Sequence, residues 1–147
     1  MFIKTYRDTL VDIKLDGPTF FAPVINRVFQ FVEECEGNPE AKLYHVLLIL
    51  TDGGIHDMRE TINQIVKCST KPLSIIIVGI GDAEFKNMDI LDADDFALYD
   101  SNGVRASRDI VQFVKYNDFI GDPCLLAEHI LCEVPDQLVS YMSDNGK

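Results

Sequence analysis

The stretch Tyr44–Asp57, YHVLLILTDGGIHD, decides how the chain folds, because it joins an apolar run directly to a polar glycine turn. The run from Leu43 to Leu50 is typical of a strand that is buried on both faces of a parallel sheet. Thr51 and Asp52 follow at the carboxyl end of this strand, and Gly53 lets the chain turn away without a Cβ clash. Ligands of open α/β sheets bind above the carboxyl ends of the strands, so Asp52 stands at a typical ligand position.

The other segments continue a strand–helix alternation along the chain. Two more strands are predicted at Leu73–Val78 and Asp109–Val114. Apolar residues at three- and four-residue steps predict helices over residues 19–36 and 58–69, a short helix over residues 83–95, and a last helix from Pro123 onward with a bend or restart at Pro135. The first twelve residues suit a short helix or an extended arm, and residues 99–107 suit a hairpin-like loop. This order predicts one α/β domain over residues 1–147, a Rossmann-like parallel sheet with helices on both faces.

Composition narrows the classes of partner. The chain has 147 residues, 47% of them hydrophobic, which is enough for one domain with a real core. Its formal net charge of -11 argues against nucleic acid and against direct contact with an anionic membrane surface. No apolar run approaches the roughly 18 residues that span a bilayer. The cysteines fit no zinc or disulfide spacing and predict buried or half-buried free thiols in a reducing, cytoplasmic setting: Cys35, Cys68, Cys124 and Cys132.

Thr19 and Asp52 are the candidate metal ligands. Their hydroxyl and carboxylate oxygens, together with water, suit Mg²⁺ or Mn²⁺ rather than zinc. Each residue also has a simpler interpretation, because Asp52 suits a turn or helix start and Thr19 stands where a helix N-cap belongs. Gly53, His56 and Asp57 lie near the same crevice and are candidates for partner contact, although Asp57 equally suits the start of the next helix.

Several segments together resemble the von Willebrand factor A-like domain of copines: YHVLLILTDGGIHDMRETINQIV, LSIIIVGIGDAEFKNMDILDADD, RDIVQFV and AEHILCEVPDQLVSYM. The resemblance implies a doubly wound α/β fold with a metal-ion-dependent adhesion site. It makes Thr19, in Gly-Pro-Thr, the threonine of the second site loop and Asp52, in Leu-Thr-Asp-Gly, the aspartate of the third. The first-loop motif, Asp-x-Ser/Thr-x-Ser, does not occur. We therefore expect residues 1–147 to be the C-terminal portion of such a domain, without its first strands and with weak or absent metal binding.

The resemblance also implies a function. It makes the chain a non-enzymatic protein-interaction module of a copine-like, calcium-dependent phospholipid-binding protein of membrane trafficking or signalling. A partner would bind through the ion, while C2 domains outside these residues would attach the full-length, cytoplasmic protein to the plasma membrane. An alternative is the A domain of a copine-related RING-type ubiquitin ligase, although no closely spaced Cys and His pairs occur here. A hydrolase that uses Asp52 and a metal is a third possibility, for which we expect no turnover.

The missing strands bear on self-association. By the same resemblance, the absent first strand would lie beside Leu43–Leu50. Without it, a flat apolar sheet edge is exposed, and such an edge is prone to pair with another chain. We expect the chain to cover this edge by forming a homo-oligomer or by folding its N-terminal arm over it.

Overall fold

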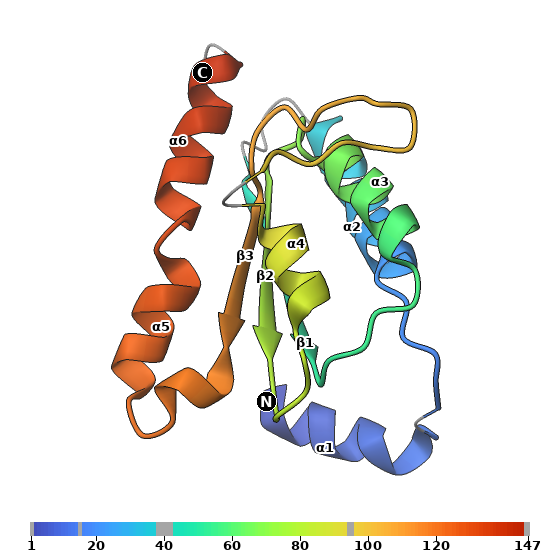
Figure 1. Ribbon diagram of the computed structural model, residues 1–147, viewed down its shortest axis with the longest axis vertical. Coiled ribbons are helices and arrows are strands. Elements are labelled where there is room, and N and C mark those ends of the chain that lie inside the picture. The colour runs from blue at the N-terminus through green and yellow to red at the C-terminus, as the bar shows by residue number, and fades with distance from the viewer. Residues whose placement is uncertain (1, 15, 38–42, 94–95, 146–147) are drawn as a thin grey trace.

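Three parallel strands form the centre of the computed structural model, which describes residues 2–14, 16–37, 43–93 and 96–145. Their order in the sheet is β1-β2-β3 (Figure 1). The strands are β1 (His45–Thr51), β2 (Leu73–Gly79) and β3 (Val111–Lys115). The three predicted strands are confirmed, although β1 and β3 each begin two residues later than expected.

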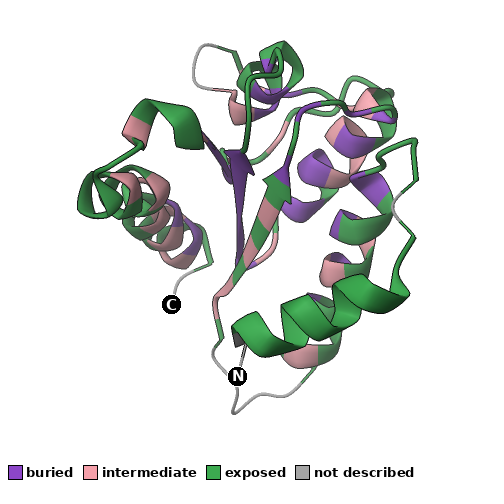
Figure 2. Ribbon diagram, turned by 90° about the horizontal axis from the view of Figure 1, so that it is seen from below, coloured by how far each residue is buried: buried purple, intermediate pink, exposed green. Residues whose placement is uncertain are grey.

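Helices cover both faces of the sheet, so the predicted α/β fold is confirmed. One face carries α2 (Ala22–Glu36) and α3 (Met58–Cys68), and the other carries α5 (Pro123–Leu131) and α6 (Val134–Asp144) (Figures 1 and 2). The short helix α4 (Lys86–Asp92) lies against β3, and a single 3₁₀ turn, η1 (Tyr116–Phe119), follows that strand. In the described part of the chain, no helix is both long enough and apolar enough to cross a bilayer.

The last helical segment divides where the sequence placed its bend. Pro135 lies in the first turn of α6, where its missing N–H and fixed φ are tolerated. The chain therefore restarts as a new helix after α5 rather than continuing through a kink. The hairpin-like loop is also confirmed, because Tyr99 and Arg105 form an isolated antiparallel bridge.

The main core lies between the sheet and the helices α2, α3 and α4. Every residue of β2 is buried, because this strand has a neighbour on each side and helices on each face. Ile25 and Phe29 of α2 and Ile65 of α3 pack over it from one face. Continuous burial of this kind is typical of a central parallel strand and explains the unbroken apolar run in its sequence.

β1 departs from the prediction that it is buried on both faces. Its exposure alternates, and Val46, Leu48 and Leu50 expose 49%, 54% and 59% of their surface. The physical reason is that α5 and α6 contact β3 and β2, which leaves the same face of β1 largely uncovered. β1 is also an edge strand, since it pairs with β2 alone among the described residues. Figure 2 shows the alternating exposure of β1 beside the fully buried β2. The exposed apolar edge expected from the sequence is therefore present.

The N-terminal arm forms a helix, α1 (Phe2–Asp12), so the first of its two predicted conformations is correct. Residues 3–12 are all exposed. The helix lies at the end of the molecule where the strands have their carboxyl ends (Figure 1). A helix satisfies its own backbone groups, so this arm does not extend the sheet beyond β1 in the way that the sequence allowed.

The four cysteines are free thiols, as predicted, but two of them are more exposed than expected. Cys68 is fully buried and Cys35 is half-buried, whereas Cys124 and Cys132 are exposed. Cys124 lies in the first turn of α5, in a helix that buries none of its residues. Burial raises the pKa of the Cys68 thiol from 9.0 to about 12, because the thiolate would lose its hydration.

The buried thiol makes stability depend on alkaline pH. Unfolded Cys68 ionises near pH 9, while the folded protein holds it neutral to about 12, so stability is lost as the pH rises through this range. From pH 9 to pH 10, the free energy of unfolding should fall by about 1 kcal/mol more in the wild type than in Cys68→Ala. Urea unfolding at both pH values checks this, and parallel pH curves for the two proteins would contradict it.

Candidate functional site

Asp52 stands at the carboxyl end of β1, where the sequence placed it. Its side chain is exposed, and no hydrogen bond or ion pair reaches it from the described part of the chain. The next residue, Gly53, is buried with φ +139°, and a Cβ there would lie 2.5 Å from the Cβ of Ala83. The turn after β1 therefore packs closely on the loop after β2, which a side chain at residue 53 would prevent.

Thr19 is held beside this turn by two hydrogen bonds with His56, one with its side chain and one with its backbone. The N–H of Thr19 donates to Nδ1 of His56 over 3.1 Å, and the N–H of His56 donates to the carbonyl of Thr19 over 3.0 Å. Segments 37 residues apart are thereby joined, so the structure brings together the two loops that carry the candidate ligands. The Thr19 hydroxyl is exposed and has no partner among the described residues.

Asp57 links the same two segments from inside the protein. It is 8% exposed and occupies the N-cap position of α3, as predicted for a helix-start residue. Its two carboxylate oxygens accept the N–H groups of Phe21 (3.0 Å) and Ala22 (2.8 Å), and Thr61 donates its hydroxyl to it over 3.2 Å. An anion at a helix N-terminus satisfies N–H groups that lack partners within the helix.

This contact corrects the expectation that Thr19 is an N-cap. Helix α2 begins at Ala22 and has no side-chain cap from its own segment. The carboxylate of Asp57 serves that purpose from 36 residues away. A cap that comes from another element leaves no local sequence signature, which is why sequence reasoning missed it.

The three predicted partner-contact residues are not equivalent. Gly53 and Asp57 are buried, and both oxygens of Asp57 are engaged with backbone N–H groups. His56 is exposed, with Nδ1 occupied by Thr19. Its Nε2 has no partner in the described part of the chain. Of the candidate residues, Thr19, Asp52 and His56 are therefore the ones exposed to solvent.

Few possible metal ligands lie at the carboxyl end of β1, at the exposed surface of Thr19, Asp52 and His56 that we call the rim. No group of three or more His, Cys, Asp or Glu side chains among the described residues is arranged to hold a metal. The available protein oxygens are the Asp52 carboxylate and the Thr19 hydroxyl, which suit a hard cation but leave most of its coordination to water.

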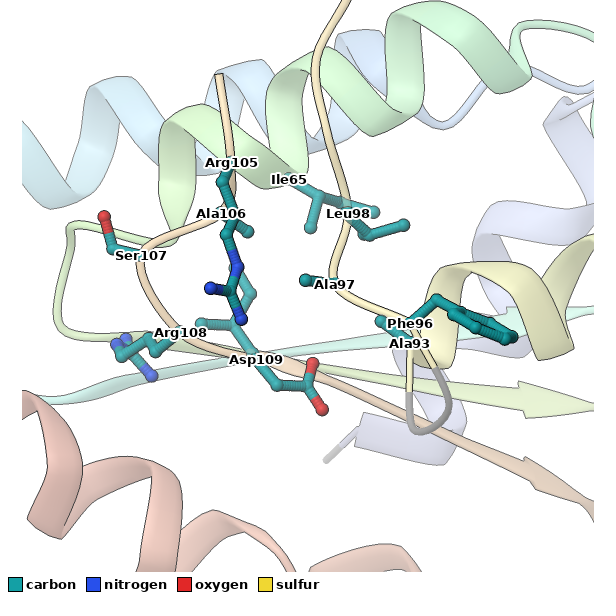
Figure 3. Close-up of a pocket in the computed structure, with 11 residues that line it drawn as sticks. Ile65, Ala93, Phe96, Ala97, Leu98, Arg105, Ala106, Ser107, Arg108 and Asp109 are labelled. Carbon is teal, nitrogen blue, oxygen red and sulfur yellow. The ribbon is translucent and has the colours of Figure 1, made fainter. Parts of the chain in front are cut away.

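A separate pocket lies at the opposite end of the sheet, near the start of β3. It has a volume of about 340 Å³ and lies between α3 and the segment that leads into β3. Ile65 and Leu98 form part of its apolar wall, and Arg105 and Asp109 lie at its side (Figure 3). None of the candidate site residues lines this pocket, so it is not part of the rim at β1.

The two aspartates of the turn should differ in their effect on stability. Asp57→Asn removes the charge that faces two backbone N–H groups, so we expect the free energy of unfolding to fall by about 2 kcal/mol. Asp52→Asn is the matched control and should change it by less than about 0.5 kcal/mol, since its side chain is exposed and contacts no described residue through a hydrogen bond or ion pair. Urea unfolding of both variants measures this, and equal losses would refute the assignment.

Comparison with known proteins shows the family. The model of the copine family matches residues 1–147. Copine-A of Dictyostelium discoideum is 50% identical over 140 residues, which cover 95% of this chain and 23% of that protein. Copine-E of the same organism is 48% identical over 146 residues, which cover 98% of this chain and 25% of that protein. The chain spans about a quarter of the length of these relatives, and it belongs to the copine family.

Proposed function

We propose that this copine domain is a non-enzymatic protein-binding module whose contact point is the rim at the carboxyl end of β1. One observation carries the proposal: the Asp52 carboxylate and the Thr19 hydroxyl are exposed and have no partner among the residues that the structure describes, on two loops that His56 joins. Asp57 is buried and engaged with backbone N–H groups, whereas the oxygens of Asp52 and Thr19 are exposed to solvent and available to a ligand. The same loops occupy the usual ligand position of an open α/β sheet.

A divalent cation at this rim would offset the repulsion between the acidic chain and an acidic partner. The chain carries a formal net charge of -11, so it repels an acidic partner. A bound Mg²⁺ or Mn²⁺ would supply a positive charge between Asp52 and a carboxylate of the partner. Thr19 and Asp52 would hold the hydrated ion, and the partner's oxygen would complete its coordination. Recruitment would then depend on the cation, and affinity for the cation alone would be weak.

The activity of the whole protein is a wider proposal, because this chain spans about a quarter of the relatives. We place it in a cytoplasmic copine that binds phospholipid in a calcium-dependent way and acts in membrane trafficking or signalling. In such a protein, membrane attachment would come from other parts of the polypeptide. This domain would supply the contact with a protein partner.

Paramagnetic Mn²⁺ locates the ion site without a known partner. Substoichiometric Mn²⁺ should broaden the amide NMR signals of Thr19, Asp52 and their neighbours before those of other acidic segments, because broadening depends steeply on distance. Asp52→Asn should abolish this local effect, and Thr19→Val should weaken it. Asp136→Asn, an exposed acidic position on α6, is the matched control and should leave the pattern unchanged.

Calorimetry with Mg²⁺ supplies the complementary result. Weak binding is expected, because two protein oxygens leave the ion largely hydrated. Micromolar affinity for Mg²⁺ would contradict the expectation that only two protein oxygens hold the ion. Mn²⁺ broadening of amide signals that is centred on another acidic cluster would refute the proposal that the rim is the functional site. Broadening that Asp52→Asn leaves unchanged would refute it as well.

A further inference from the structure

A groove lies between α3 and α4, beside the pocket at the start of β3. It has a volume of about 430 Å³, and we call it the α3–α4 groove. Helix α4 packs against β3, the strand at the other edge of the sheet from β1. No residue of β1 or α2 lines the groove, so it does not result from the open edge of β1. Its main lining residues are Ile62 of α3, Asp89 and Ile90 of α4, and Phe96, Leu98 and Tyr99 of the segment after α4.

The α4 wall of the groove is fixed to the core. Met88 and Leu91 are fully buried, and they hold α4 on the rest of the protein. Asp92, at the end of the helix, accepts the N–H of Phe113 in β3 over 2.6 Å. Ile90, which faces the groove, therefore stands on a helix that is anchored on both sides of it.

The opposite wall is tied to α3. Asn63 of α3 accepts the N–H and the hydroxyl of Ser101 over 2.8 Å and 2.9 Å, and Arg59 donates to the same hydroxyl over 2.9 Å. Leu98 accepts the N–H of Ala106 over 2.9 Å, which closes the base of the hairpin next to Tyr99. Both walls are thus in place before anything binds, and a preformed site spends little free energy on ordering.

Large apolar side chains are exposed along this groove. Ile90, Phe96 and Tyr99 expose 54%, 84% and 57% of their surface. Figure 3 shows that the ring of Phe96 points away from Ile65 and Leu98, which face the neighbouring pocket. Single exposed apolar residues are common on protein surfaces, whereas several that gather at one hollow mark an interaction site.

The chain that surrounds the groove is strongly acidic. Residues 82–100 contain seven Asp or Glu residues and one Lys, so they carry a net charge of -6, more than half of the -11 of the whole chain. Asp89 lines the groove, and its contact with Lys115 is long, at 3.9 Å. The exposed rings of Phe96 and Tyr99 can also accept a cation on their faces. An apolar groove in a negative potential is complementary to an apolar segment that carries positive charge.

We propose that the α3–α4 groove binds a basic amphipathic peptide segment of a partner protein. The aliphatic side chains of this segment fill the groove against Ile62, Ile90 and Phe96. Its Lys or Arg side chains lie beside them, where they meet Asp89 and the faces of the exposed rings. A helix with apolar side chains on one face and basic ones next to them has this pattern.

This groove is distinct from the ion site proposed at the rim. The rim would meet an acidic partner through a cation, whereas the groove meets a basic segment directly. None of the rim residues lines the groove. Asp52→Asn should therefore leave peptide binding unchanged, and loss of peptide binding should leave Mn²⁺ broadening at the rim intact. The two proposals fail separately.

Fluorescence anisotropy with a labelled peptide of Leu and Lys, arranged in an amphipathic helical pattern, tests the binding. Replacing every Lys of the peptide by Glu should weaken binding at least about tenfold, because the charge is reversed. Replacing every Leu by Ala should also weaken it at least about tenfold, because the apolar anchors are lost while the charge is kept.

Variants of the protein separate the groove from the general acidity of the chain. Phe96→Ala should weaken binding of the Leu/Lys peptide at least about tenfold, and it leaves the fold intact because Phe96 is largely exposed. Asp89→Asn should weaken binding as well, but by less. Val139→Ala is the matched control, because Val139 is also exposed (61%) but lies on α6 at the other face of the sheet, and it should leave binding unchanged.

Amide NMR shifts locate the bound peptide. The largest changes are expected at Ile62, Ile90, Tyr99 and their neighbours. Changes centred on the rim or on α6 would overturn the proposal. So would a Glu-containing peptide that binds as tightly as the Lys-containing one, no detectable binding of either, or binding that Phe96→Ala leaves unchanged. A wild-type dimer that Phe96→Ala dissociates would assign the groove to a second copy instead.

Discussion

The carboxylate of Asp57 holds together the two parts of the chain that carry the candidate site. It is buried, it accepts the N–H groups of Phe21 and Ala22, and it stands at the start of α3 directly after the turn from β1. The entrance of α2 is thereby fixed to the carboxyl end of the sheet. His56 adds two hydrogen bonds to Thr19 one residue earlier in the turn. These contacts bring the Thr19 loop to the loop of Asp52.

The same turn separates structural residues from available ones. Gly53 and Asp57 are buried and engaged in packing or hydrogen bonds, while Asp52 projects to solvent without a partner among the described residues. A rigid frame around uncommitted oxygens is what a binding site requires, because its ligands are held in place before binding.

The sequence predicted the elements well where burial is complete. LSIIIV in β2 is β-branched and apolar because both faces are covered, and its pattern admits little else. β1 has a similar composition, yet alternate side chains of this strand are exposed because no helix fully covers one of its faces. Composition alone does not reveal which strands the helices will cover. The positions of Thr19 and Asp52 followed from strand and helix boundaries. The role of Asp57 did not, since its partners lie 35 and 36 residues away in the sequence and only the fold brings them close.

The central claim is that Asp57 and His56 lock the entrance of α2 to the turn after β1, and amide hydrogen exchange of the native protein tests it most directly. The amides of Thr19, Phe21 and Ala22 precede or begin a helix, where N–H groups have no partner within the helix and ordinarily exchange fast. The contacts described above predict that all three are protected to a degree comparable with the interior of α2. Exchange of these amides as fast as in an unstructured peptide would contradict the account.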